Sequence, residues 1–467
     1  MSKQVVIVGG GIGGLSAAAR IAQCGVRVTV LEARSDPGGL ASTAVREGLT
    51  FDAGPYLLLD RPGLEWAFQS LGLDLEEQVP MRRVEEVYQV QSGEEEPVRF
   101  HASLEQTIEG FERRWPGSGQ RYRQFVAETH GRYQRLLPLQ RAIPVRSRLL
   151  RGGAWREIPF LLRSLETVLG GAGLPAPVVD SLGIWTHVAG QKLSEAISPL
   201  AFVPALIHTV GCYLPPGGIG SIPRALAAEA RRAGAEIRFG AEVREIRCEG
   251  GRAIGVETAE GFLPADAVLS NAGGLRTYLE LLHGIPGPAQ ESLRRLPLQS
   301  PGLCAYLAVR GAPRPPYLRF RIMPGEMCRL LIAPAVVAPE MTRDGWAPAR
   351  LMMPLRHDDA ERLGAEGQEA LLDAILEEPW WREGLDEVRV LYRRTPTTWG
   401  AEFGLYRDSM NPAMTGEFMR AGRMAHRSPH VRGLYLTGSS THPGQWTSFC
   451  AISGILAADQ LREDLGP

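Results

Sequence analysis

The residues whose types and spacing first indicate chemistry are glycines that follow an apolar segment near the N-terminus. Gly9, Gly11 and Gly14 fit the pattern GxGxxG, with Gly13 inside it, and Glu32 follows 18 residues after Gly14. Glycine in such a turn lets backbone approach a pyrophosphate, and an acidic residue about 20 positions further on accepts hydrogen bonds from a ribose. This spacing predicts a site for the phosphates and ribose of a dinucleotide.

The elements that must position these residues flank the turn. Residues 5–8 are a continuous apolar run, which is typical of a strand buried in a parallel sheet. Residues 15–24 have the alanine-rich, apolar spacing of a helix that Gly25 ends. Residues 27–31 predict a second strand, and Glu32 lies at its end. The strand–helix–strand order places the free N–H groups of a helix N-terminus at the glycine turn, where they attract phosphate.

A second glycine pattern, Gly171-x-Gly173-x-x-Ala176, lacks this context. No clear strand leads into it, and Pro175 and Pro177 interrupt the helix that should follow. We therefore interpret this segment as a loop. The chain is not expected to contain a separate domain for a nicotinamide dinucleotide.

Two later regions predict further parts of a nucleotide fold. Residues 214–223 are rich in glycine and proline and precede a helix that ends near Gly234. Strands are expected over residues 236–239, 242–248, 253–258 and 266–270. Near the C-terminus, residues 433–438 predict a strand that runs into a glycine turn, and residues 445–461 predict a helix.

These regions together resemble the phytoene desaturase (carotenoid desaturase) family of the FAD-dependent, amine-oxidase-like superfamily. The resemblance is carried by VVIVGGGIGGLSAAARIAQCGVRVTVLEARSDPGGLASTAVREGLTFDAGPYLLL, by residues 211–272, and by LYLTGSSTHPGQWTSFCAISGILAADQL. It implies an α/β fold, with a Rossmann-like FAD-binding domain of the GR2 or amine-oxidase type and a discontinuous α+β substrate domain. The expected FAD-binding domain comprises residues 1–90, 206–274 and 396–467, and the expected substrate-binding or lid domain comprises residues 91–205 and 275–395.

The resemblance implies FAD as the cofactor. Glu32 would bind the adenosine ribose, and the backbone of Val243 would bind adenine. Arg34 and the Gly38-Gly39 segment would line the pyrophosphate and the flavin. The C-terminal helix would direct its positive end toward the flavin. The full set of expected cofactor contacts is Gly9, Gly11, Gly13, Gly14, Glu32, Ala33, Arg34, Gly38, Gly39, Leu40, Gly54, Pro55, Val243, Gly438, Trp446 and Thr447.

The implied activity is removal of hydrogen from a C–C or C–X bond of an apolar substrate, with hydride transfer to flavin N5. Flavin amine oxidases of similar fold commonly carry a lysine near the flavin. Only Lys3 and Lys192 occur among 51 basic residues, and neither has that context, which argues against amine oxidation. Gln445 and Trp446 are the expected contacts of the reacting atoms, and no residue is identified as the base.

Several activities remain open, because Gln445 and Trp446 replace the small residues that many carotenoid desaturases carry at these positions. The main hypothesis is a phytoene or carotenoid desaturase-like enzyme. One alternative is a flavin-dependent oxidase or dehydrogenase of a natural-product pathway with a smaller substrate. A carotene isomerase-like enzyme and a non-catalytic FAD-bound protein are further alternatives. The expected electron acceptor is oxygen or a quinone.

The composition of the chain excludes some classes of partner and ligand. The net charge of −1 gives no reason to expect a nucleic-acid partner, and six scattered cysteines without ligand spacing predict no metal site. We find no signal peptide or apolar span and expect a cytoplasmic protein. Residues 132–163 carry eight arginines and one acid among leucines and aromatic residues. This segment predicts either a solvated lid or peripheral contact with the inner face of an anionic membrane.

Overall fold

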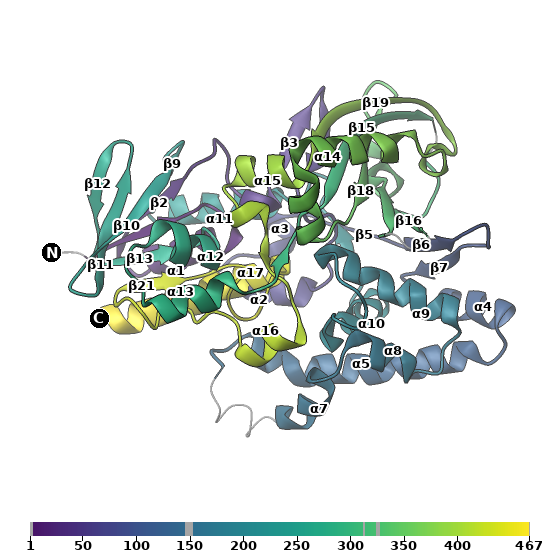
Figure 1. Cartoon of the computed structure of the whole chain (residues 1–467), viewed down its shortest axis with the longest axis horizontal. Helices are drawn as coiled ribbons and strands as arrows, with labels where there is room; N and C mark the ends of the chain where they lie inside the picture. The colour runs from purple at the N-terminus through teal and green to yellow at the C-terminus, as the bar shows by residue number, and fades with distance from the viewer. Residues whose placement is uncertain (1–2, 145–152, 312, 324–326, 467) are drawn as a thin grey trace.

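The computed structural model describes residues 3–144, 153–311, 313–323 and 327–466, and a five-stranded parallel sheet forms one side of the molecule (Figure 1). The strand order is β21-β13-β1-β2-β9. Every neighbouring pair in this sheet is parallel. Its strands are β1 (Gln4–Val8), β2 (Arg27–Glu32), β9 (Glu236–Phe239), β13 (Ala267–Ser270) and β21 (Leu434–Leu436). Three distant stretches of sequence therefore build one sheet.

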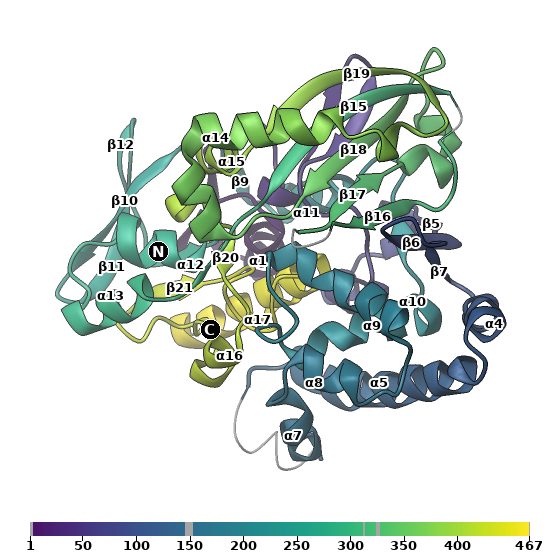
Figure 2. The same cartoon turned by 45° about the vertical axis from the view of Figure 1, so that its right-hand side comes forward.

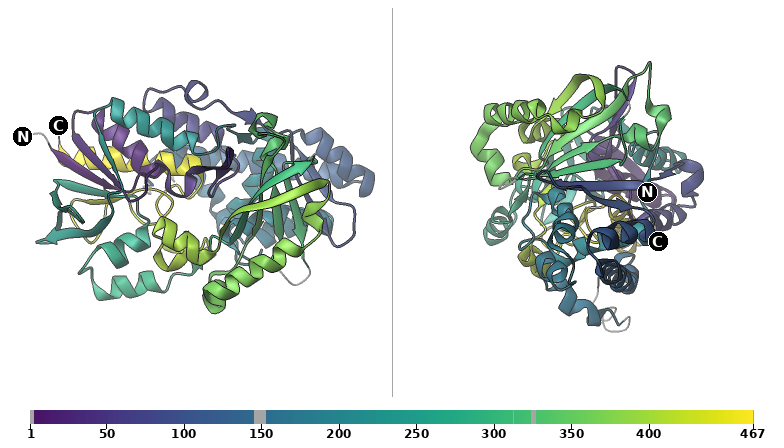
Figure 3. Two further views of the ribbon diagram at one scale, coloured as in Figure 1. Left: turned by 90° about the horizontal axis from the view of Figure 1, so that it is seen from above. Right: turned by 90° about the vertical axis from the view of Figure 1, so that its right-hand side faces the viewer.

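Helices and a small antiparallel sheet complete this side of the molecule. The helices α1 (Ile12–Ala22), α2 (Arg61–Gln69), α11 (Ser221–Arg232) and α17 (Thr447–Leu465) pack together and share one apolar core with β1 and β2. Strands β10 (Val243–Glu249), β11 (Arg252–Thr258) and β12 (Gly261–Pro264) form an antiparallel sheet whose core includes β1 and β13 residues. Figure 3 shows α17 in yellow alongside the parallel strands, with both chain termini at the same end.

The second side of the molecule is built on a seven-stranded sheet of order β19-β15-β18-β17-β16-β6-β7. Its strands are β6 (Glu86–Ser92), β7 (Val98–His101), β15 (Leu303–Gly311), β16 (Leu318–Ile322), β17 (Arg329–Ile332), β18 (Ala347–Met353) and β19 (Leu385–Arg394). Only β16 and β6 pair in parallel among these described strands. The helix α14 (His357–Glu377) packs against β15 and shares a core with this sheet.

A group of helices lies on the other side of this sheet, as Figure 2 shows. They include α4 (Leu104–Arg114), α5 (Ser118–Gln140), α7 (Ile158–Leu161), α8 (Leu165–Gly170), α9 (Ala176–Gly183) and α10 (Phe202–Thr209). The remaining short elements include β3 (Thr43–Arg46), β4 (Leu49–Asp52), α3 (Leu75–Gln78), β5 (Arg82–Arg83), β8 (Tyr213–Leu214), α12 (Gly274–Arg276), α13 (Gly287–Arg294), β14 (Leu298–Gln299), α15 (Pro396–Phe403), β20 (Asn411–Pro412) and α16 (Gly416–Ala421). None of the described helices has the length and apolarity needed to span a bilayer.

The loop expected around residues 171–177 is partly wrong. The helix α9 begins at Ala176, so that Pro177 lies in its first turn and Pro175 is its N-cap. Proline is well tolerated there, because an N–H in the first turn has no intrahelical acceptor to lose. The element directly before this helix is the helix α8, so the segment still lacks the strand–turn–helix context of a dinucleotide site.

The contact between α1 and α17 depends on small residues. A β-carbon placed on Gly454 would overlap the carbonyl oxygen of Gly13 and lie 2.7 Å from the β-carbon of Ser16. The neighbouring Ser453 hydroxyl accepts a hydrogen bond of 2.9 Å from the backbone N–H of Gly438. The close approach of these helices therefore also fixes the glycine turn that follows β21.

We expect Gly454→Ala to lower the free energy of unfolding by about 1–3 kcal/mol, because the added methyl group overpacks the α1–α17 contact. Gly110→Ala is the matched control, since Gly110 is an exposed residue of α4 and a β-carbon there would meet no atom within 4 Å. That control should be neutral or stabilising by about 0.5–1 kcal/mol. Urea unfolding followed by circular dichroism measures both, and equal stabilities would contradict the packing argument.

Candidate functional site

A cavity of about 760 Å³ lies at the carboxyl ends of the parallel strands. Ligands of open α/β sheets bind in this crevice. The expected residues that line the cavity are Gly9, Gly11, Gly13, Glu32, Ala33, Arg34, Gly38, Gly39, Leu40, Gly54, Pro55, Val243, Gly438, Gln445, Trp446 and Thr447. Gly14 lies behind this wall, where a β-carbon would overlap the carbonyl oxygen of Gly9.

Glu32 is fixed at the end of β2 by backbone donors. One carboxylate oxygen accepts the N–H of Gly10 at 2.7 Å and the other accepts the N–H of Arg34 at 2.9 Å. The residue is only 6% exposed. No ion pair joins Glu32 to a cation among the described residues, and each oxygen has further acceptor capacity. The carboxylate is therefore suited to accept the hydroxyl groups of a ribose.

Three loops meet beside the glycine turn, where no room is left for side chains on Gly11 and Gly13. A β-carbon on Gly11 would lie 2.5 Å from the amide nitrogen of Asn271, the residue that follows β13. A β-carbon on Gly13 would lie 2.8 Å from the Asn271 amide oxygen and 2.9 Å from the backbone nitrogen of Gly438. Because the first turn of α1 opens on this cradle, its free N–H groups suit a pyrophosphate. These residues fit a dinucleotide cofactor.

Arg34 joins the glycine-rich loop to α15. Its guanidinium donates to the Ser42 hydroxyl at 3.0 Å and pairs with Glu402 at 3.3 Å. Glu402 also accepts two hydrogen bonds from Arg394. Burial alone would raise the pKa of Glu402, but the hydrogen bonds and charge of Arg394 outweigh it and hold that pKa below its usual value. The arrangement keeps the Glu402 carboxylate ionised and Arg34 in place at the cavity wall.

The Gly54 turn is held by the seven-stranded sheet. The Tyr306 hydroxyl and the Arg350 guanidinium both donate to the carbonyl oxygen of Ala53, at 3.0 and 2.9 Å. The N–H of Gly54 donates to the carbonyl oxygen of Leu40 at 2.9 Å. Residues of the second sheet therefore position a loop that lines the nucleotide side of the cavity.

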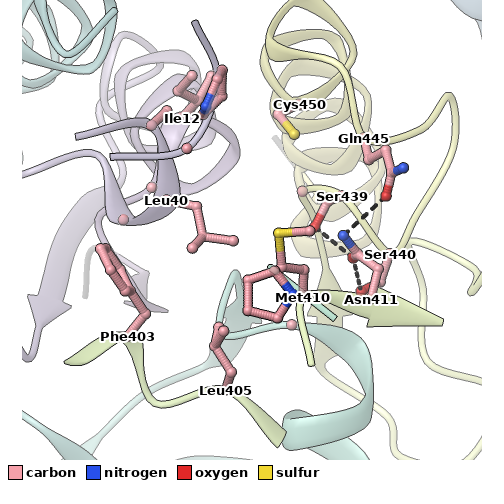
Figure 4. A pocket seen from close by; sticks show the side chains of 18 of the residues that line it. Ile12, Leu40, Phe403, Leu405, Met410, Asn411, Ser439, Ser440, Gln445 and Cys450 are labelled. Carbon is pink, nitrogen blue, oxygen red and sulfur yellow. Dashed lines mark hydrogen bonds between the residues drawn. The ribbon is translucent and has the colours of Figure 1, made fainter. Parts of the chain in front are cut away.

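Gln445 belongs to a polar network that reasoning from the sequence missed. The Asn411 amide donates to the Gln445 side-chain oxygen at 3.1 Å and accepts the Ser439 hydroxyl at 2.8 Å (Figure 4). Asn411 belongs to the two-residue strand β20, which no local pattern predicts. Trp446 stacks on Phe449 with ring centroids 5.0 Å apart and also packs against the core of the helical region. It is thus both a wall of the cavity and part of a core.

Two further polar groups in the wall have no signal in the sequence. The Asp60 carboxylate accepts the Tyr133 hydroxyl at 2.6 Å and the Ser448 hydroxyl at 2.8 Å, and it also caps α2 through the N–H of Gly63. The Tyr56 hydroxyl lies 2.7 Å from a ring nitrogen of His187. The partners in these contacts are far apart in sequence, so no spacing could have revealed them.

Other candidate residues lie away from the cavity wall. His442 bonds to the carbonyl oxygen of Leu139 at 2.9 Å, which favours a structural role. Neither Lys3 nor Lys192 lines the cavity, and Lys192 is exposed.

One group of potential metal ligands occurs among the described residues, formed by His357, Asp358 and Glu361. The Arg407 guanidinium lies 2.6 Å from Glu361, so a cation already occupies the position beside that carboxylate. We assign no metal site to this group.

Comparisons with known proteins give the family and the fold of the chain. The chain is 28% identical over 497 residues to the zeta-carotene-forming phytoene desaturase of Myxococcus xanthus, covering 98% of this chain and 94% of that protein. Among solved structures, an oxidoreductase from Methanosarcina mazei superposes with a TM-score of 0.68 at 17% identity, covering 98% of this chain and 100% of the other. Putrescine oxidase bound to putrescine gives a TM-score of 0.65 at 16% identity, with 99% of each chain covered.

Residues 12–462 match the family described as "Flavin containing amine oxidoreductase". This match confirms the expected FAD cofactor and the activity class of a flavin-dependent oxidoreductase. The solved structures confirm the expected α/β fold of the amine-oxidase type. The chain belongs to the flavin-containing amine oxidoreductase family.

Proposed function

We propose that this oxidoreductase removes hydrogen from carbon–carbon bonds of a long apolar polyene precursor, as a carotenoid desaturase does. The observation that carries the proposal is an apolar part of the cavity wall, formed by Trp185, Leu200 and Val203 of one hydrophobic core. The described residues that line the cavity include no lysine. An apolar wall suits a hydrocarbon, because burying apolar surface on binding is favourable. The similarity to the phytoene desaturase of Myxococcus xanthus supports the same substrate class.

The residues of the nucleotide side are assigned roles within this proposal. Glu32 holds the ribose, the backbone at Gly11 and Gly13 holds the pyrophosphate, and Val243 holds adenine. The start of α17 at Thr447 presents free N–H groups and a positive helix end to the cavity. The bound flavin supplies a two-electron acceptor for a hydride from carbon. The apolar wall holds the substrate in place and excludes water.

We expect Glu32→Gln to weaken FAD retention by roughly 10–100-fold, because the new amide N–H₂ opposes a backbone donor and removes a charge-assisted acceptor. Equilibrium titration of the apoprotein with FAD, followed by flavin fluorescence, measures the change. Glu236→Gln is the control, since Glu236 pairs with Arg238 at the surface of β9. If Glu32→Gln retains FAD as well as this control does, the assignment of Glu32 to the cofactor site is contradicted.

A product assay tests the substrate class. We expect anaerobic addition of phytoene in lipid vesicles to bleach the flavin, and extraction should recover a product with a longer conjugated system. Addition of oxygen or of a quinone should then restore the flavin spectrum and identify the acceptor. Bleaching by a smaller polycyclic compound and by none of the C30 or C40 polyenes would instead favour the natural-product oxidase. A polyene that changes only its double-bond geometry would favour the isomerase.

We also propose that the segment over residues 154–163 lies against an anionic membrane surface. Trp155, Ile158 and Leu162 are 50%, 44% and 66% exposed. Trp155 lies in the short 3-10 helix Ala154–Glu157 that leads into α7, Ile158 begins α7, and Leu162 directly follows it. Their spacing of three and four in this helical backbone places them on one face. Arg156 and Arg163, both exposed, flank this face. On the inner side of α7, Phe160 belongs to a core against which the cavity residue Trp446 packs. The exposed face is therefore one apolar layer away from the cavity.

The arginines of the longer segment contribute unequally to this surface. Arg132 and Arg135 both pair with Glu157, at 2.7 and 2.6 Å, so one of their two positive charges is balanced. Arg141 donates to the carbonyl oxygen of Pro62. The remaining expected arginines, Arg146, Arg148 and Arg151, lie outside the described residues. We therefore assign the contact to the apolar face of α7 and its flanking charges.

The triple variant Trp155→Ser, Ile158→Ser, Leu162→Ser should bind anionic vesicles at least about tenfold more weakly, because three side chains lose apolar burial of about 1.5–3 kcal/mol each. Co-sedimentation with phosphatidylglycerol vesicles measures this. The control variant, Val45→Ser with Phe262→Ser, removes exposed apolar residues from other surfaces. If both variants sediment like the wild type, the segment is a solvated lid.

A further inference from the structure

The Tyr56 and His187 side chains form a polar pair in the apolar wall of the cavity. The Nδ1 atom of His187 lies 2.7 Å from the carbonyl oxygen of Ile184, and a carbonyl can only accept, so Nδ1 carries the hydrogen. In this neutral ring Nε2 is an acceptor, and it receives the Tyr56 hydroxyl at 2.7 Å. The Tyr56 oxygen therefore keeps its acceptor capacity and has no hydrogen left to donate to a ligand.

The surroundings of the pair are apolar. Both residues line the cavity, both are buried, and the His187 ring lies among Trp185 and Phe320. Burial lowers the pKa of His187 to about 4 and raises that of Tyr56 above its usual value. At neutral pH both groups are thus uncharged. The Tyr317 hydroxyl donates to the carbonyl oxygen of Tyr56 and helps to fix the backbone at this position.

We propose that Tyr56 and His187 accept the proton that the substrate loses when its new double bond forms. This inference rests on the proposed desaturation. One carbon loses hydrogen with its bonding electron pair, as a hydride, to the flavin oxidant. The adjacent carbon loses a proton to the Tyr56 oxygen, while the Tyr56 hydroxyl proton moves to Nε2 of His187. The electrons of the second C–H bond form the double bond, and His187 later releases its proton to water.

A weak base is sufficient for this step. Departure of a hydride leaves positive charge on carbon, and a C–H bond next to such a centre is strongly acidic. A neutral pair can therefore accept the proton, and it imposes no charge on the apolar wall before the reaction, which would be costly.

Four other polar groups of the cavity wall are less suited to this task. The Asp60 carboxylate already accepts hydrogen bonds from Tyr133, Ser448 and Gly63. The Gln445 and Asn411 side chains are amides, which do not take up a proton near neutral pH. Burial raises the pKa of Cys450 to about 12, so that its thiol stays protonated.

The chain contains a matched control pair outside the cavity. The Tyr122 hydroxyl lies 2.8 Å from Nε2 of His208, and burial also lowers the pKa of His208 to about 4. Neither residue lines the cavity. Tyr122→Phe therefore removes a tyrosine–histidine hydrogen bond of the same kind at a position that does not line the cavity.

The experiment uses the FAD-loaded enzyme with phytoene in lipid vesicles, and it measures flavin content, substrate dissociation constant and the anaerobic bleaching rate. We expect Tyr56→Phe to keep its FAD and its substrate affinity within about twofold and to bleach at least about 100-fold more slowly. His187→Gln retains an acceptor for the Tyr56 hydroxyl but cannot take up a proton, so it should show the same loss. Tyr122→Phe should bleach within about threefold of the wild type.

Two further measurements separate a proton acceptor from a structural or binding role. Phytoene deuterated at the proton-losing carbon should give a larger isotope effect in Tyr56→Phe than in the wild type, because proton removal becomes rate-limiting. Nitrogen NMR of labelled wild-type enzyme should show His187 protonated at Nδ1 alone at pH 7. Equal bleaching losses in Tyr56→Phe and Tyr122→Phe, a change in affinity alone, or a doubly protonated His187 would overturn the inference while the desaturase proposal stands. If the wild type itself does not bleach, the proposed function fails and the inference fails with it.

Discussion

The close approach of backbone at Gly13 is the constraint on which the site depends. The loops after β1, β13 and β21 meet there, and the Asn271 side chain and the Gly438 backbone already fill the space beside Gly13. The carbonyl oxygen of Gly13 also faces Gly454 of α17. A side chain at Gly13 would therefore displace the loops after β13 and β21, and one at Gly454 would separate α17 from α1. The phosphate site and the core beneath it therefore depend on the same few small residues.

The nucleotide side of the cavity could be predicted from the sequence, because its signals are local. The glycine turn and Glu32 belong to one strand–helix–strand unit, and their spacing alone predicts that they line one cavity. The substrate side could not be predicted in this way. Tyr56 and His187 are 131 residues apart and Asp60 and Ser448 are 388 apart, so their meeting depends on packing that no short pattern records. The start of α9 shows a different error. Pro177 suggests a helix breaker in the sequence, but it lies in the first turn of this helix, where proline is tolerated.

The two sides of the molecule are coupled through shared residues. Arg350 of the seven-stranded sheet holds the carbonyl oxygen of Ala53, and Arg34 of the nucleotide side pairs with Glu402 of α15. The Arg350 charge is buried and therefore costly to leave without a partner, whereas the Arg34–Glu402 pair is half-buried and contributes less. Both contacts resist separation of the two sides. At the start of α17, Ser448 reaches Asp60 and thereby the helix α5. The geometry of the cavity is thus set by both sheets and by the helical region together.

The order of the strands in the parallel sheet has a consequence for biosynthesis. The edge strand β21 and the helix α17 are formed by residues 434–465, while β1 and the glycine turn are made first. Gly438 and Thr447, which line the cavity, belong to this last-made part of the chain. The cavity wall is therefore complete only once α17 has docked on α1.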